Sequence, residues 1–185
     1  MSVSSSEGLA DLGLVAAAEA IAAREITSSE LLEACLKRLD AVNPVLNATI
    51  WVDREHARGD AFGADSATAA GKARGKLHGI PLAHKDMYYQ AGRPATCGSA
   101  IRRDFVPDYT CTVVERLSEQ GAFSFAGLNM AEFAQNPTGH NRAFGDCHNP
   151  WNPPYITGGS SSGSGAAVAA ESMAALECGE LRSSA

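Results

Sequence analysis

Residues 158–165 read Gly-Gly-Ser-Ser-Ser-Gly-Ser-Gly and lead directly into residues 166–176, a run of mostly small residues. A glycine–serine run taken alone most often forms a flexible linker. Here the residues that follow predict a helix over 166–176, so the run forms a loop at a helix start. Free backbone N–H groups and the positive end of the helix dipole favour an anion or a developing oxyanion at such a loop. A phosphate-binding loop would carry a lysine after its last glycine, and none follows here.

Helical and strand-like segments alternate upstream of this loop. Thr27 and Glu30 have the spacing of a capping box, which predicts a helix start. The pair Asn43 and Pro44 is expected to end that helix, because proline cannot continue it. The alternation predicts an α/β fold built in layers. The expected helices span residues 14–23, 27–43, 55–72 and 112–120, and the expected strands span residues 48–52 and 123–127.

Two further segments are distinctive. Residues 75–81 are rich in turn-forming residues and lead into Leu-Ala-His-Lys-Asp at 82–86, an apolar, strand-like entry that ends in charge. Residues 136–154 are dominated by Asn, Gly, Pro and His, which predicts irregular backbone with Trp151 as its packing anchor. Long irregular segments in compact domains are often functional.

The composition is that of an ordinary globular protein, with 185 residues, of which 45% are hydrophobic and 19% charged. A formal net charge of −6, from scattered acidic residues, argues against direct binding of nucleic acid or of an anionic membrane surface. No apolar run approaches the ~20 residues of a membrane span, and the first residues lack the features of a signal peptide. We therefore expect a cytoplasmic protein.

The cysteines form no C-x-x-C pair and fit no zinc-binding template, so we expect buried free thiols in a reducing compartment. His140, Cys147 and His148 could suggest metal ligands, but without further ligands at suitable spacing a hydrogen-bonded loop explains them better. We expect neither a metal nor a cofactor. The five cysteines are Cys35, Cys97, Cys111, Cys147 and Cys178.

Several of these segments together resemble the amidase signature family. Residues 158–165 resemble its Gly-Gly-Ser-Ser loop, and residues 75–86 resemble its G-x-L-x-G-x-P-x-x-x-K-D segment. Residues 129–133, 144–145 and 149–153 are also similar to family motifs, in the family's order. The resemblance covers about residues 14–176. It implies the N-terminal part of the amidase-signature fold, a mixed sheet flanked by helices, within a single domain.

The resemblance also implies a catalytic site. Lys85 corresponds to the family's catalytic lysine, and Ser160 to its bridging serine, which a cis peptide bond holds. Gly158, Gly159 and Ser161 correspond to the surrounding binding loop. Lys85 must be neutral to accept a proton, so its pKa of ~10.4 has to be lowered by burial or by neighbours. The apolar approach in residues 80–83 fits that requirement. Ser160 would pass the nucleophile's proton to Lys85, with lysine in the place of the usual histidine base.

The family's nucleophile lies in a G-[ST]-D-[ST]-G-G-S-I-R segment, whereas residues 177–185 read Glu-Cys-Gly-Glu-Leu-Arg-Ser-Ser-Ala. Ser184 occupies the usual offset from Ser160, but without paired glycines the backbone is not expected to aim its amides at an oxyanion, and such donors contribute ~3–4 kcal/mol each. We expect a truncated or frameshifted gene product that is inactive by itself. This interpretation fails if no reading frame of the DNA encodes Asp-x-Gly-Gly-Ser. The expected divisions are helices at 1–43, sheet and catalytic loops at 44–176, and an aberrant tail at 177–185.

The two neighbours of Lys85 in this segment have other expected tasks. His84 is not expected to act as a base, since the family's chemistry uses lysine there, and Asp86 is expected to hold a backbone turn or a nearby cation.

The resemblance implies hydrolysis of a small-molecule carboxylic amide to the acid and ammonia or an amine. Two alternatives stay open: the glutaminase-type subunit of a tRNA-dependent amidotransferase, and a catalytically inactive fragment. A homodimer and a complex with amidotransferase subunits are both compatible with the sequence.

Overall fold

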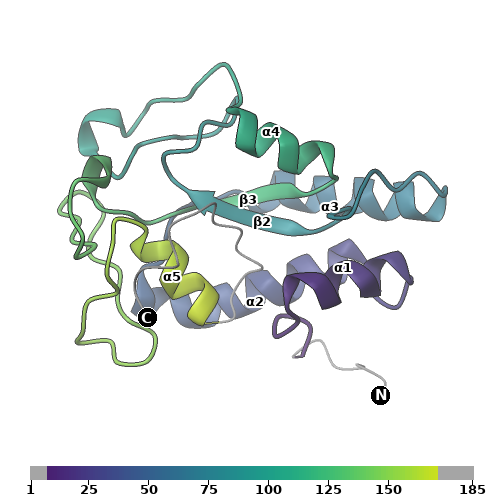
Figure 1. Ribbon diagram of the computed structural model, residues 1–185, viewed down its shortest axis with the longest axis horizontal. Helices are drawn as coiled ribbons and strands as arrows, with labels where there is room; N and C mark the ends of the chain where they lie inside the picture. The colour runs from purple at the N-terminus through teal and green to yellow at the C-terminus, as the bar shows by residue number, and fades with distance from the viewer. Residues whose placement is uncertain (1–7, 171–185) are drawn as a thin grey trace.

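The computed structural model describes residues 8–170, which form an α/β fold around a small mixed sheet (Figure 1). The three strands lie in the order β1-β3-β2, where β1 is Thr49–Val52, β2 is Pro81–Lys85 and β3 is Phe123–Leu128. Strand β2 runs parallel to β3, whereas β1 runs antiparallel to it. The predicted fold class, a mixed sheet flanked by helices, is therefore confirmed.

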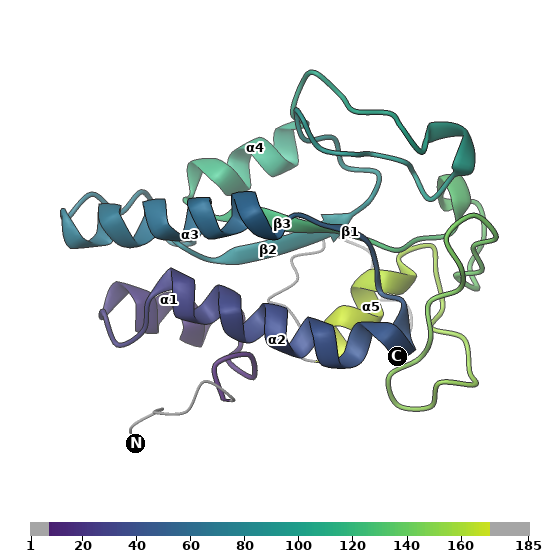
Figure 2. The same ribbon diagram turned by 180° about the vertical axis from the view of Figure 1, so that it is seen from behind.

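Helices cover both faces of this sheet. Helices α1 (Leu14–Ala22), α2 (Ser28–Leu46) and α5 (Ser162–Ala169) lie on one side, and α4 (Thr112–Glu119) lies on the other (Figures 1 and 2). Helix α3 (Arg54–Ala69) packs against both α2 and β3. Two short 3-10 helices, Ala100–Arg102 and Glu132–Ala134, interrupt the connecting segments. None of the helices within residues 8–170 is both long and apolar enough to cross a bilayer.

The capping box predicted at the start of α2 is present. The Thr27 hydroxyl oxygen accepts a hydrogen bond from the Glu30 backbone N–H, and the Glu30 carboxylate accepts the Thr27 backbone N–H at 2.8 Å. The apolar face that follows is buried against the sheet and forms the largest part of the core. Its buried residues include Leu31, Leu32, Ala34, Cys35, Leu36 and Leu39.

The predicted end of α2 was wrong, because the helix continues through Pro44 to Leu46. Pro44 removes one backbone donor, but both Pro44 and Asp40, whose carbonyl loses its partner, are exposed to water. The last turn is held by the hydrogen bond from Asn47 N–H to the Asn43 carbonyl at 2.8 Å and by the buried side chain of Leu46. Asn47 then ends the helix in the left-handed region.

The glycine–serine run is also more helical than predicted, since α5 begins at Ser162 instead of residue 166. Gly163 explains this early start. A Cβ atom there would lie 2.3 Å from the Ala48 carbonyl oxygen and 2.4 Å from the Asn129 nitrogen, so only glycine lets the first turn approach the sheet so closely. The Gly163 N–H donates to the Asn129 carbonyl at 2.8 Å. The predicted continuation to residue 176 lies outside the described residues.

The irregular segment 136–154 has turns and bends but no helix or strand, as predicted. Its expected packing anchor was wrong, because Trp151 is 84% exposed. Polar contacts hold this loop instead. The Asn136 side chain accepts backbone N–H groups from Thr138 and Gly139, and the Asn141 side chain accepts those of Ala143 and Phe144.

Candidate active site

Lys85 is the last residue of β2 and lies beside Leu128, the last residue of the parallel strand β3. Its side chain is buried, with 4% of the residue exposed. The Lys85 Nζ atom donates to Ser160 Oγ at 2.7 Å and to Ser161 Oγ at 2.8 Å. Two hydroxyl groups from the glycine–serine loop therefore meet the amine at the carboxyl ends of the parallel strands β2 and β3, where α/β folds commonly place their sites.

The loop that carries these serines is fixed on both sides. The peptide bond between Gly159 and Ser160 is cis, and Gly158 has a φ of 79°. The Ser160 carbonyl accepts the N–H of Ala131 at 2.9 Å, which ties the loop to the segment that follows β3. A Cβ atom on Gly159 would lie 2.6 Å from the Gly139 nitrogen, so the irregular segment 136–154 packs directly behind the loop.

Asp86 continues the chain directly after Lys85 and is 1% exposed. Its Oδ2 atom accepts both the backbone N–H and the hydroxyl of Thr96, and its Oδ1 atom accepts the Trp51 indole N–H at 2.9 Å. Burial raises the pKa of the Asp86 carboxyl above its ordinary value, and the hydrogen bonds from Thr96 and Trp51 oppose that rise. Asp86 holds a backbone turn, as expected.

His84 lies on the opposite face of β2 from Lys85, because successive strand residues alternate. Its ring makes edge contacts with Trp51 and Tyr88, with ring centroids 6.0 Å and 6.4 Å apart. Burial lowers the pKa of His84, so the ring favours the neutral form. The imidazole contacts neither Ser160 nor Ser161 in the hydrogen bonds of the described residues, so this geometry gives it no part in their chemistry.

The structure thus places the buried Lys85 amine against two serines of the Gly-Gly-Ser-Ser loop, and the first of them, Ser160, follows a cis peptide bond. A family model described as Amidase matches residues 30–176. The chain belongs to the amidase family.

Relatives within this family are longer than the chain. A glutamyl-tRNA(Gln) amidotransferase subunit from Anaeromyxobacter sp. (strain K) is 45% identical over 162 residues, which are 88% of this chain and 33% of the relative. The chain thus spans about a third of the length of the curated relatives that it matches.

Solved amidase-family structures share the same fold. Peptide amidase from Stenotrophomonas maltophilia superposes with a TM-score of 0.82 at 32% identity, covering 88% of this chain and 35% of its own. A chain of a vestigial protein complex linked to the origins of an s-triazine catabolic enzyme superposes with a TM-score of 0.84 at 34% identity, covering 88% of this chain and 36% of its own.

The structure brings together Lys85, Ser160 and Ser161. Gly158 and Gly159 directly precede the two serines in the chain. The sequence assigned Ser161 to the binding loop only, whereas its hydroxyl contacts the amine as closely as Ser160 does. Ser184, the doubtful nucleophile position, lies outside the described residues.

Sequence reasoning missed Trp51 and Thr96, the two side chains that hold Asp86. Thr96 lies in a connecting segment with no recognisable pattern. Trp51 was part of a predicted strand, where an aromatic residue is ordinary. The one available signal was the indole N–H of Trp51, which is a polar group on an aromatic ring within a strand next to the expected site.

The expected hydrogen-bonded loop around His140 and His148 is present. His140 Nδ1 lies 2.7 Å from Asp146 Oδ2, and His148 Nδ1 lies 2.9 Å from the Pro153 carbonyl oxygen. Burial raises the pKa of Cys147 to about 12, which keeps its thiol protonated. Within residues 8–170 no group of three His, Cys, Asp or Glu side chains could hold a metal ion.

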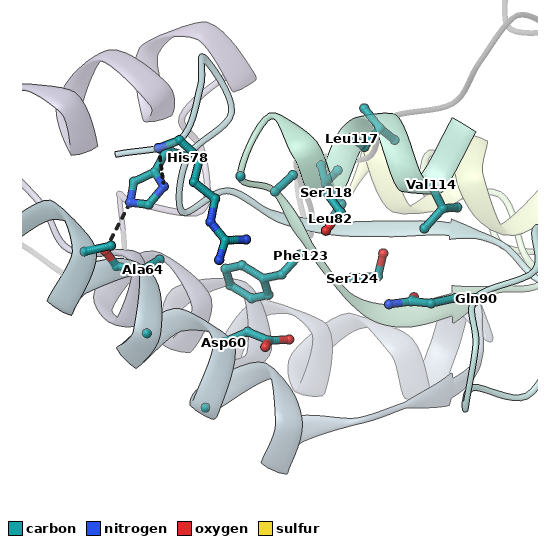
Figure 3. Close-up of a pocket in the computed structure, with 16 residues that line it drawn as sticks. Asp60, Ala64, His78, Leu82, Gln90, Val114, Leu117, Ser118, Phe123 and Ser124 are labelled. Carbon is teal, nitrogen blue, oxygen red and sulfur yellow. Dashed lines mark hydrogen bonds between the residues drawn. The ribbon is translucent and has the colours of Figure 1, made fainter. Parts of the chain in front are cut away.

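A separate cavity of about 380 Å³ lies between α3 and α4, over the other face of the sheet (Figure 3). Leu82, Phe123 and Ser124 of the strands line it, with Asp60 from α3 and Ser118 from α4. Lys85, Ser160 and Ser161 are not among its lining residues. The cavity is therefore distinct from the candidate active site.

Proposed function

We propose that this chain carries the base and the bridging serine of an enzyme that hydrolyses carboxylic amides. The single observation that carries the proposal is the 2.7 Å contact between the buried Lys85 Nζ and Ser160 Oγ. General bases act within hydrogen-bonding distance of the group whose proton they take, about 2.6–3.2 Å between heavy atoms. Membership of the amidase family supports this choice of chemistry.

The proposed proton route starts at the nucleophile's hydroxyl. As that oxygen attacks the amide carbon, its proton passes to Ser160 Oγ, and the Ser160 proton passes to a neutral Lys85 amine. A neutral amine has two N–H groups and one lone pair, so Ser161 Oγ accepts one N–H while the lone pair receives the proton from Ser160. The route then reverses to protonate the leaving nitrogen, which departs as ammonia or an amine. Water attacks the acyl-enzyme ester, and the carboxylic acid is released.

The nucleophile of this mechanism is the third member of the proposed Lys–Ser–Ser triad. Ser184 has the family offset from Ser160 but lacks the glycines that would aim backbone N–H groups at the oxyanion. A fluorophosphonate probe labels activated serines, and mass spectrometry of the labelled chain identifies the position. We expect no labelling at Ser184, and labelling there would overturn the interpretation of residues 177–185 as an aberrant tail.

A second candidate is the glutamine-hydrolysing subunit of a tRNA-dependent amidotransferase. The observation that favours it is the 45% identity to the glutamyl-tRNA(Gln) amidotransferase subunit from Anaeromyxobacter. Here the small-molecule substrate is glutamine, the tRNA is bound outside this chain, and ammonia passes to a partner protein. Stable co-purification with other subunits supports this candidate, whereas a monomer or homodimer argues for a free-standing amidase.

The third candidate is an inactive fragment, which predicts no amide hydrolysis in any context. For each candidate we propose a cytoplasmic location.

A chimaera with peptide amidase tests whether the Lys85–Ser160 pair can support amide hydrolysis. Residues 30–176 replace the matching segment of peptide amidase, and we call the product the grafted amidase. We expect it to release ammonia or amine from amide substrates, and the Lys85→Ala variant to be inactive. A grafted amidase that folds but hydrolyses no amide would contradict the proposal and favour the inactive fragment.

A further inference from the structure

The end of β2 is where the proposed base must be held, and the pairing of β2 with β3 ends at Lys85. The chain reverses there, because the N–H groups of Met87 and Tyr88 both donate to the Lys85 carbonyl, at 2.7 Å and 3.0 Å. The position of Lys85 Nζ therefore depends on how firmly the next residue, Asp86, is fixed. Asp86 is fixed through its backbone by two hydrogen bonds, from its N–H to the Leu128 carbonyl at 3.1 Å and from the Cys97 N–H to its own carbonyl at 2.8 Å.

A side chain from the far edge of the sheet also reaches Asp86. Trp51 belongs to β1, which pairs with β3 and not with β2. Its indole N–H donates to Asp86 Oδ1 at 2.9 Å, so the ring must cross β3 to make this contact. The crossing point is Gly127, where a Cβ atom would lie only 2.1 Å from Trp51 Nε1 and 2.4 Å from Cε2. Only glycine in the central strand leaves room for the indole.

An irregularity in the β1–β3 pairing brings Trp51 to this crossing point. Thr49 pairs with Leu128, and a regular ladder would place Trp51 beside Ala126. The register shifts between Thr49 and Trp51, so Trp51 pairs with Gly127 instead. Bulges of this kind re-aim side chains and are frequent next to active sites.

We propose that Trp51 and Asp86 form a hydrogen-bonded bridge across β3 that fixes the carboxyl end of β2, so that both act as positioning residues for Lys85. The bridge lies on the His84 face of the strand, which leaves the opposite face free for the contact between Lys85 and Ser160. This inference rests on the proposed function only for the task of Lys85. The geometry that it describes can be tested without a substrate.

The test is backbone hydrogen exchange, measured by NMR on the full chain carrying Trp51→Phe, which removes the indole donor and keeps an aromatic ring. We expect the amides of Asp86 and Cys97 to exchange about tenfold to a hundredfold faster, the factor that a hydrogen bond to a charged acceptor commonly contributes. The Phe123 amide, which donates to the Ile80 carbonyl at the other end of the same strand pair, is expected to keep its rate. The Ser160 amide resonance is expected to shift.

The matched control is Trp151→Phe, the same change at an indole that is 84% exposed, and it is expected to alter none of these signals. Equal acceleration at Asp86, Cys97 and Phe123 would mean a general loss of stability and would overturn the inference. An unmoved Ser160 resonance would overturn it as well.

Asp86→Asn provides a second variant should Trp51→Phe fail to fold, because it keeps the shape of the side chain and weakens the acceptor. It is expected to shift the Trp51 indole N–H resonance, which Trp151→Phe identifies by elimination. An indole resonance that does not respond would contradict the bridge. Failure of amide hydrolysis in the grafted amidase would overturn the proposed function and leave these exchange results intact, so the two failures are distinguishable.

Discussion

The two faces of β2 differ in what their side chains contact at the carboxyl end of this strand. On one face Lys85 donates hydrogen bonds to two hydroxyl groups from the loop before α5. On the other face the Trp51 indole donates to Asp86, and the Trp51 ring makes an edge contact with His84. We infer that one strand end separates two tasks. In this proposal the Lys85 face supplies groups that move protons, and the opposite face supplies groups that keep the strand in place.

The largest expected effect is a loss of kcat, and it tests whether the residues on the Lys85 face of β2 catalyse the reaction. In the grafted amidase, Ser160→Ala is expected to lower kcat by about 10⁴-fold or more, as removal of a member of a catalytic triad commonly does. Ser161→Ala removes only an acceptor of the resting amine, so we expect a loss of about tenfold to a hundredfold. Steady-state amide hydrolysis measures both. Equal losses of kcat in the two variants would contradict the proposal that Ser160 relays the proton while Ser161 only accepts a hydrogen bond from the amine.

The next effect concerns the opposite face, where Gly127 admits the Trp51 ring. Gly127→Ala is expected to lower the free energy of unfolding of the full chain by about 1–3 kcal/mol, because the new methyl group overlaps the indole. Gly59→Ala is the matched control, since a Cβ there meets nothing within 4 Å in α3, and it is expected to stabilise the chain by about 0.5–1 kcal/mol. Urea denaturation measures each change.

A double variant sharpens this prediction. Trp51→Val removes the ring, so adding Gly127→Ala to Trp51→Val is expected to cost less than Gly127→Ala alone. Contacting residues are commonly non-additive by about 0.5–3 kcal/mol. Additive losses would show that the indole does not lie against Gly127.

A smaller effect follows from the buried imidazole of His84. Burial lowers its pKa below the ordinary value of 6.5, so the unfolded chain binds a proton there more readily than the folded chain. The stability that depends on neutral His84 is therefore complete above pH 6.5 and is lost as the pH falls below that value. The slope for this one group is at most about 1.4 kcal/mol per pH unit. His84→Gln is expected to flatten the decline in the free energy of unfolding between about pH 7 and about pH 5. An unchanged slope would contradict burial of the ring.

The smallest effect is expected in the irregular segment. Trp151 is 84% exposed, so Trp151→Phe is expected to change the free energy of unfolding by no more than about 0.5 kcal/mol. A loss several times larger in thermal or urea denaturation would restore Trp151 as a packing anchor, as the sequence had suggested.

Much of the fold follows from local sequence patterns. The capping box at Thr27, the strand around Trp51 and the strand-like approach to Lys85 all appear in the structure near their predicted bounds. The proximity of Lys85 and Ser160, 75 positions apart, came from the family resemblance and not from any local pattern.

The features that could not be predicted depend on tertiary contacts. Pro44 remains in a helix because the lost hydrogen bond falls at a solvated surface, which the sequence does not show. The early start of α5 depends on the close approach of Gly163 to the sheet. The bridge from Trp51 to Asp86 requires a register shift between two strands, and strand register is set by the partner strand.

We propose that the amine at position 85 receives the proton that leaves the nucleophile, and replacing this amine is the sharpest test of that step. In the grafted amidase, Lys85→Met keeps an unbranched side chain without a basic nitrogen. We expect a loss of about 10⁴-fold or more in kcat, with the change concentrated in kcat and not in KM. Turnover by the Lys85→Met variant equal to that of its parent would show that this amine is not the base.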